Sequence, residues 1–135
     1  MKALTIAATI DNLETVTAFV DEQLEAFDCP MKAQMQIDIA IDELFSNIAY
    51  YAYAPDMGDA TIQVELLEEP RSVKLTFIDS GIPYDPLKKE DPNTRLSVEE
   101  REIGGLGIFM VKKTMDDMSY EYKDGRNRLS IVKHI

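Results

Sequence analysis

Two short turns between β-strand patterns most constrain the fold of this chain. Residues 60–69 (ATIQVELLEE) and 72–80 (SVKLTFIDS) read as strands and are joined through "EPR". Residues 119–135 contain a second pair of strands around Asp124-Gly125, a dipeptide typical of tight hairpin turns. Because a hairpin makes its two strands antiparallel neighbours, the sequence predicts a mostly antiparallel sheet.

Helical spacing of apolar residues dominates the rest of the chain. An opening strand is expected at 3–10, followed by a helix from about 12 to 27, a second from 31 to 53 and a third at 106–118. The predicted inward positions of the second helix are Met35, Ile37, Ile41, Leu44 and Ile48. The sequence therefore predicts an α+β fold, a two-layer sandwich with three helices on one face of a mixed, mostly antiparallel sheet.

Composition narrows the function classes. A chain of 135 residues fits one domain, which we expect to span 1–135. The net charge of −11 argues against nucleic acid and anionic membrane surfaces as partners. No apolar run approaches the ~20 residues of a membrane helix. No signal-peptide pattern is present, and one cysteine, Cys29, suits a reducing compartment, so we expect a cytoplasmic protein.

Periodicity mostly vanishes between the second hairpin strand and the third helix. The segment 82–105 contains Pro83, Pro86 and Pro92 and many charged residues. A connection of this length inside a compact domain is usually a functional lid or is disordered. We expect it to be a lid.

Two polar residues interrupt the apolar pattern of the second predicted helix. In "IDELFSNIAYYAY", Glu43 and Asn47 are four residues apart and therefore project from nearly the same line of the helix. Glu43 could accept the proton of a hydroxyl or a water, and Asn47 offers a neutral oxygen to a hard cation such as Mg²⁺. The alternative is an ordinary solvated helix face.

A second polar pair follows a predicted strand. In "FIDSGIPYDP", Asp79 ends the strand and Gly81 stands where the chain turns. A carboxylate in this place could accept a hydrogen bond from an exocyclic amine such as the 6-amino group of adenine, and the glycine would let a flat ring approach the backbone. An Asp-Ser-Gly turn without a ligand is the alternative.

Three glycines directly precede the third predicted helix. Gly104, Gly105 and Gly107 in "IGGLGIFMV" would free backbone N–H groups to point at an anion, next to the positive end of the helix dipole. The pattern is neither a P-loop nor a dinucleotide-binding fingerprint. The alternative is a flexible hinge without a ligand.

Taken in order, the three motifs resemble those of the GHKL (Bergerat-fold) ATPase superfamily. The strings "ELFSNIAYYAY", "DSGIPYDP" and "GGLGIFMVKKTMDDMSYEYKDGRNRLSI" are most similar to the bacterial anti-sigma-factor serine/threonine kinases, in which a D-G-x-N pattern follows the glycine motif. The resemblance covers nearly the whole chain. It implies ATP and Mg²⁺ as cofactors and catalysis by positioning and charge neutralisation.

The resemblance implies a role for each polar residue. Glu43 is expected to be the base that activates the acceptor hydroxyl, and Asn47 is expected to bind Mg²⁺. Asp79 is expected to accept from the adenine amino group, with Gly81 giving the base room.

The remaining roles fall on the C-terminal half of the chain. Gly104, Gly105 and Gly107 are expected to close the lid over the phosphates, and Ser130 to stand near adenine. Tyr51 occupies a position where many family members have histidine.

Two functions remain open at this point. The resemblance implies a kinase that phosphorylates a STAS-type anti-anti-sigma protein and sequesters a sigma factor as a homodimer. The alternative is a nucleotide-gated binding module with little or no kinase activity. It is motivated by Ile103, because some members carry an arginine before the glycines, and Arg95 or Arg101 would have to replace it.

Overall fold

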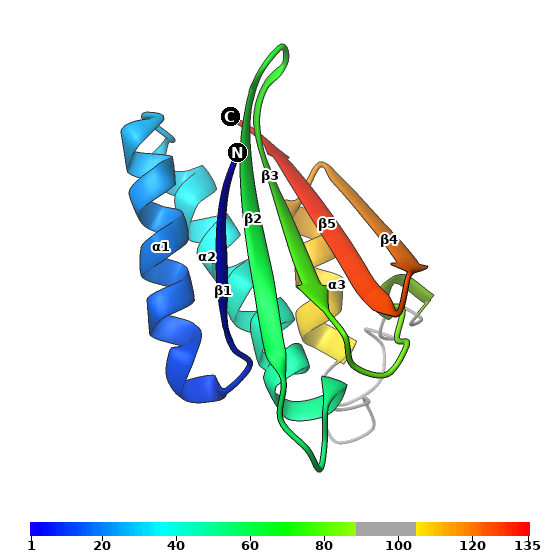
Figure 1. The fold of residues 1–135 in the computed structure, drawn as a ribbon. Coiled ribbons are helices and arrows are strands. Elements are labelled where there is room, and N and C mark those ends of the chain that lie inside the picture. The colour runs from blue at the N-terminus through cyan, green and yellow to red at the C-terminus, as the bar shows by residue number, and fades with distance from the viewer. Residues whose placement is uncertain (89–104) are drawn as a thin grey trace.

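The computed structural model describes residues 1–88 and 105–135. The elements follow one another along the chain as β-α-α-β-β-α-β-β, as predicted (Figure 1). The strands are β1 (Lys2–Ala7), β2 (Asp59–Glu68), β3 (Arg71–Asp79), β4 (Asp117–Lys123) and β5 (Arg126–His134). The helices are α1 (Leu13–Ala26), α2 (Met31–Asn47) and α3 (Gly105–Thr114).

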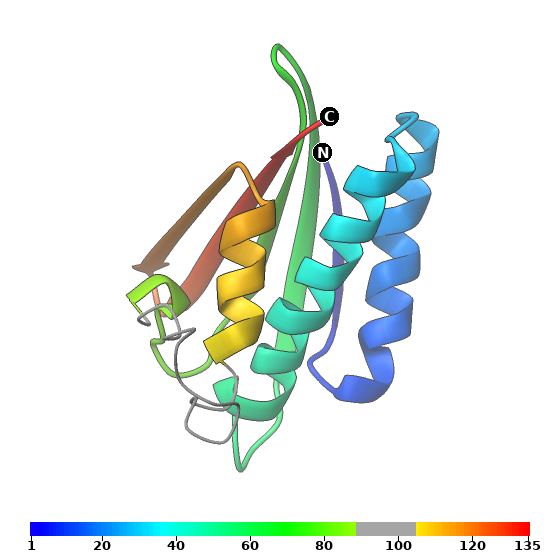
Figure 2. The same ribbon diagram turned by 180° about the vertical axis from the view of Figure 1, so that it is seen from behind.

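The five strands form one sheet in the order β1-β2-β3-β5-β4. Every neighbouring pair is antiparallel, so the sheet of the described residues is not mixed. All three helices cover one face and leave the other open (Figures 1 and 2). The predicted two-layer α+β sandwich is confirmed.

The core lies between the helices and the sheet. The apolar side chains that fill it include Val16, Val20, Leu24, Ile37, Ile41, Phe45, Ile62, Leu75 and Phe77. Met35 was expected to point inward but is 58% exposed. Its position is two residues, or about 200° around the helix, from the buried Ile37, so it lies on the opposite side of α2.

The second helix does not continue as an α-helix to residue 53. It ends at Asn47 and passes into one turn of π-helix, Ile48–Ala52 (η2). A π-helical turn often marks a functional site, because the wider turn displaces side chains and carbonyls from their usual positions. The predicted third helix also ends early, at Thr114, because Met118 already pairs with Ile131 in the sheet.

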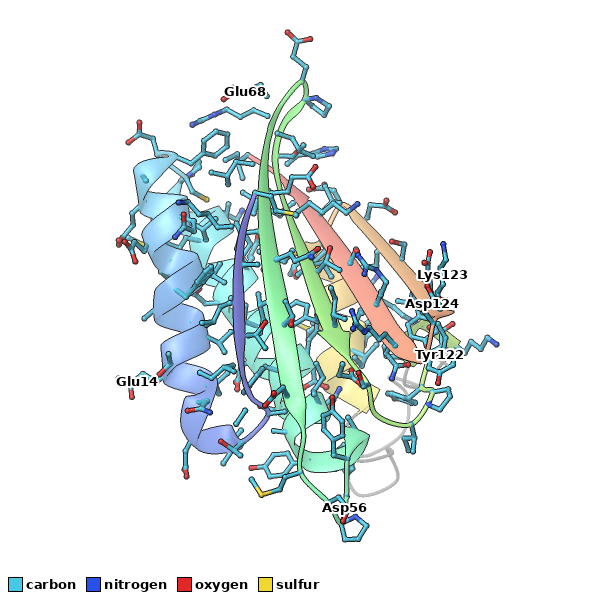
Figure 3. All side chains as sticks on the ribbon, in the orientation of Figure 1. Glu14, Asp56, Glu68, Tyr122, Lys123 and Asp124 are labelled. Atoms are coloured by element: carbon cyan, nitrogen blue, oxygen red, sulfur yellow. The ribbon has the colours of Figure 1, made fainter. Side chains whose placement is uncertain are left out.

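The two ends of the sheet carry different hairpin turns. Glu68 lies by the β2–β3 turn, whereas Lys123 and Asp124 mark the β4–β5 turn at the other end (Figure 3). The C-terminal end of α2 lies at this second end (Figure 1). Of the expected lid, residues 89–104 fall outside the described part of the chain.

Candidate functional site

A cavity of about 320 Å³ lies where the C-terminal half of α2, η2, the end of β3 and the β4–β5 hairpin meet. Its polar lining includes Asn47, Tyr51, Asp79 and Asn127, and its apolar lining includes Leu44, Ile48, Phe77 and Leu129. This volume is in the range of small-molecule sites, which combine apolar walls with a few polar groups. The arrangement suits a flat, partly apolar ligand with polar edges.

The helix motif reaches the cavity through Asn47. Its amide nitrogen donates a hydrogen bond of 3.3 Å to Glu43 Oε1, as expected for residues one turn apart. This bond leaves the amide oxygen of Asn47 for another partner. Glu43 itself does not line the cavity but lies one turn back along α2, half-buried.

Gly107 brings the glycine motif to Glu43. A Cβ atom added at Gly107 would overlap the carboxylate of Glu43, so only glycine allows this approach. Gly105 is the first residue of α3, and Gly104 lies outside the described residues. The first turn of α3, whose backbone N–H groups have no partner within the helix, therefore starts beside the catalytic candidate.

Asp79 ends β3 and is only 7% exposed. Its Oδ1 accepts hydrogen bonds from Gly81 N and Asn127 Nδ2, both of 2.9 Å. Neither bond engages Oδ2. Because Asp79 lines the cavity with one oxygen already satisfied by the protein, the other is available to a ligand that donates.

Gly81 is required by the packing of the protein itself. A Cβ atom there would overlap the backbone of Ala52, whose carbonyl accepts a hydrogen bond of 3.0 Å from Ile82 N. The Tyr53 hydroxyl accepts from Ser80 N at 2.7 Å and donates to Asp59 O at 2.6 Å. The end of η2 therefore holds the turn that follows Asp79.

Ser130 does not belong to this cavity. Its hydroxyl lies 2.9 Å from that of Thr76, in a polar hollow on the open face of the sheet. Successive residues of a strand face opposite sides, and the neighbouring Leu129 lines the cavity instead. Ser130, which was expected near adenine, therefore lies on the opposite face of the sheet from the cavity that contains Asp79.

Asn127 is a polar residue of β5 that does line the cavity. It lies two residues before Leu129 and faces the same side of β5. The D-G-x-N pattern, which ends at Asn127, was the sequence signal that could have identified it.

Three tyrosines surround the cavity. Tyr51 lines it but is 64% exposed, so it stands at the mouth. Burial raises the pKa of Tyr84, and the nearby Glu43 carboxylate raises it further. Burial likewise raises the pKa of Tyr120. The phenols of Tyr84 and Tyr120 therefore act as neutral hydrogen-bonding groups.

Comparison with known protein families shows which family has this combination of fold and motifs. The sequence pattern of the histidine kinase-like ATPase domain matches residues 6–133. The chain belongs to this family. Membership implies ATP as the ligand of the histidine kinase-like ATPase domain. The helix motif and the strand-end motif line the cavity through Asn47 and Asp79, and the glycine motif lies next to it, where Gly107 contacts Glu43.

Named relatives refine the position of the chain within the family. It is 29% identical over 103 residues to the serine/threonine-protein kinase BtrW of Bordetella bronchiseptica, covering 76% of this chain and 72% of BtrW. It is 33% identical over 101 residues to the serine-protein kinase RsbW of Bacillus cereus strain B4264, covering 72% of this chain but only 61% of RsbW. The predicted resemblance to serine/threonine kinases is confirmed.

A solved structure supports the fold. The crystal structure of the RsbU and RsbW domains of Rv1364c from Mycobacterium tuberculosis matches 99% of this chain and 32% of that one. The TM-score is 0.69 at 20% sequence identity, which shows a shared fold. In the described part of the chain, no helix is long and apolar enough to cross a membrane.

Proposed function

We propose that this chain is an ATP-dependent protein serine/threonine kinase that phosphorylates a STAS-type anti-anti-sigma protein and sequesters a sigma factor, acting as a homodimer. The observation that carries the proposal is the meeting of three separate motifs. Glu43 contacts both Asn47 and Gly107, and Asn47 shares a cavity with Asp79. The names of the kinase relatives support the reaction type.

The adenine end of the cavity is assigned to Asp79. Its Oδ2 would accept from the 6-amino group, while Oδ1 remains bonded to the protein. Ile48, Phe77 and Leu129 supply apolar lining for the faces of the purine ring. This assignment favours adenine over guanine, which carries an oxygen acceptor at the same position.

The phosphate end is assigned to Asn47 and the start of α3. The amide oxygen of Asn47 is a ligand of the kind that Mg²⁺ takes, and its amide nitrogen is already bonded to Glu43. When bound, Mg²⁺ would neutralise charge on the phosphates. The N–H groups of the first turn of α3 can donate to phosphate oxygens because they lack intrahelical partners.

Phosphoryl transfer requires a base for the acceptor hydroxyl. Glu43 takes the proton as the serine or threonine oxygen of the substrate forms a bond to the γ-phosphorus. The bond between that phosphorus and the β–γ bridging oxygen breaks, and ADP leaves with the electron pair. The hydrogen bond that Asn47 donates to Oε1 holds the Glu43 carboxylate in one orientation for this proton transfer.

The test compares Glu43→Gln with the neighbouring Asp42→Asn. Both changes replace a carboxylate by an amide on α2, but Asp42 is exposed and accepts a hydrogen bond from Ser46 in the same helix. Radiolabelled ATP is mixed with each variant and with STAS proteins from the same genome. Glu43→Gln is expected to bind Mg·ATP but to transfer label about 1000-fold more slowly, and Asp42→Asn is expected to act like wild type. Normal transfer by Glu43→Gln would contradict the base assignment.

A nucleotide-gated binding module is the second candidate. It is favoured by Ile103, which stands where some family members carry an arginine before the glycines. Its signature is ATP-dependent association with a STAS protein or a sigma factor, seen by gel filtration, without label transfer. Sedimentation of the free chain tests the homodimer in the same preparation.

A further inference from the structure

The side-chain amide of Asn127 uses its full hydrogen-bonding capacity inside the protein. Its Nδ2 donates to Asp79 Oδ1 and to Ile82 O, both at 2.9 Å. Its Oδ1 accepts from Tyr84 N at 3.1 Å and from the Tyr120 hydroxyl. An amide has two N–H donors and one carbonyl oxygen with two lone pairs, so none of its positions remains for a ligand.

These four bonds allow one orientation of the amide only. A flip would turn its oxygen toward two acceptors, Asp79 Oδ1 and Ile82 O, and its N–H groups toward two donors. Asn127 is 6% exposed, so water cannot replace the lost partners. A carboxylate of the same size could not donate to Asp79, and an alanine could make none of the bonds.

We infer that Asn127 is a positioning residue that determines the base selectivity of the site through Asp79. It keeps Oδ1 of Asp79 engaged with the protein, so that Oδ2 is the oxygen presented to the 6-amino group. This inference rests on the proposed function, because it takes adenine as the ligand.

The same amide joins the base site to the segment that leads toward residue 89. Its bonds to Ile82 O and Tyr84 N hold this segment beside Asp79. The segment is held from the other side by Ala52, which accepts from Ile82 N. Recognition of the 6-amino group and the path of the chain after β3 therefore depend on one side chain.

Loss of Asn127 has a distinct expected effect. Asp79 Oδ1 would lose one of its two donors, and the carboxylate would turn to seek another partner. ATP would then lose the benefit of its 6-amino group, whereas purine riboside 5′-triphosphate, which lacks that group, has no such benefit to lose. The selectivity ratio, Kd of the purine triphosphate over Kd of ATP, should fall about tenfold, the value of a hydrogen bond to a charged group.

The experiment measures both dissociation constants by calorimetry on the full chain with saturating Mg²⁺. Asn127→Ala should lower the ratio about tenfold, and Tyr120→Phe, which removes one donor to Asn127 Oδ1, about threefold. Arg128→Ala is the matched control, because the next residue of β5 faces the hollow on the open side of the sheet. Its ratio should equal that of wild type.

A double-mutant cycle separates positioning from a merely structural role. In Asp79→Asn the ratio should already be close to one, and adding Asn127→Ala should not lower it further. The inference is overturned if Asn127→Ala weakens both nucleotides equally, or if its effect on the ratio persists in Asp79→Asn. If Asn127→Ala does not fold, as judged by its Tm without nucleotide, Tyr120→Phe decides in the same way.

The same measurements distinguish a failure of the proposed function from a failure of this inference. A wild-type chain that binds neither nucleotide overturns both. A wild-type chain that prefers ATP, together with an unchanged preference in folded Asn127→Ala, overturns only the role of Asn127.

Discussion

The two halves of α2 differ in the surroundings of their carboxyl groups. In the C-terminal half, Glu43 receives a hydrogen bond from Asn47. In the N-terminal half, Asp38 faces Asp21 of α1, and the Oδ1 atoms of both are buried without a donor in the described part of the chain. Burial, and then Asp21 and Glu25, raise the pKa of Asp38 to about 7.

The difference shows what a neighbouring amide does for a carboxylate. Asp38 and Asp21 are both carboxyl groups, so one can donate a hydrogen bond to the other only when it carries a proton, and Asp38 keeps its proton up to near neutral pH. Asn47 supplies a donor to Glu43 without adding negative charge. Asp21 and Asp38 therefore suit a structural contact between helices, whereas Glu43 with its amide partner Asn47 suits a base.

The largest expected effect is on the phosphotransfer rate, and it should occur for a variant in the C-terminal half of α2 but not for one in the N-terminal half. Glu43→Gln should reduce phosphotransfer by about 1000-fold, the range of a positioned general base, whereas Asp38→Asn should leave it unchanged. Single-turnover assays with labelled ATP measure both rates. Equal losses in the two variants would mean that the halves of α2 do not differ in function.

Gly107→Ala tests the contact that sets Glu43 apart from Asp38. The added Cβ would overlap the carboxylate of Glu43 and force it or α3 to move. Since misplacement of a catalytic group by about 1 Å costs about 100-fold, the transfer rate should fall by that factor. Met110→Ala, on the exposed side of α3, is the control and should keep the wild-type rate.

Asn47→Asp turns the carboxylate–amide pair of Glu43 and Asn47 into two facing carboxyl groups, as in Asp21 and Asp38. The new carboxylate still offers oxygen to Mg²⁺, but it no longer donates to Glu43 and repels its ionised form, so the pKa of Glu43 should rise. If Glu43 then behaves like Asp38, whose raised pKa is about 7, about half of Glu43 is ionised at pH 7. The transfer rate should therefore fall about twofold at pH 7, fall further at lower pH and recover as the pH rises. A pH–rate profile identical in shape to that of wild type would contradict this explanation.

The smallest effect concerns stability. The pKa of Asp38 in the folded chain, about 7, lies above the unfolded value of 3.8, so the folded state binds more protons between these values. Stability should therefore fall as the pH rises from about 4 to about 7. Because Asp38 is partly exposed, solvent screening limits this to about 1 kcal/mol.

Asp38→Asn is the variant that checks this pH dependence. It should flatten the dependence and should be more stable than wild type at pH 8, because it removes the unfavourable negative charge. Urea midpoints between pH 5 and pH 8 provide the measurement. A wild-type midpoint that rises over this range would overturn the assignment of the retained proton to Asp38.

Local sequence patterns were sufficient to predict where the motifs lie and how the helices and the sheet form two layers. One-turn spacing placed Glu43 beside Asn47, and the end of a strand placed Asp79. The sequence did not show that Ser130 faces away from the cavity. Side chains alternate between the two faces along β5, so Ser130, three residues after Asn127, lies on the other side of the sheet.

Other features depend on packing that no local pattern records. The apolar spacing continues to Tyr53, although the α-helix gives way to a π-helical turn at Ile48. The contact between Asp21 and Asp38 depends on how α1 and α2 are rotated against each other. The contact of Gly107 with Glu43 likewise joins elements far apart in the chain.

The long sequence separation between Asp79 and its amide partner has a consequence for folding order. Asn127 lies 48 residues after Asp79, and it arrives only when β5 pairs with β3. A chain still being synthesised can form α2 with its Glu43–Asn47 pair, but it has no finished cavity before that pairing. Nucleotide capture would therefore report that the sheet is complete, and it would favour the finished domain over every shorter intermediate.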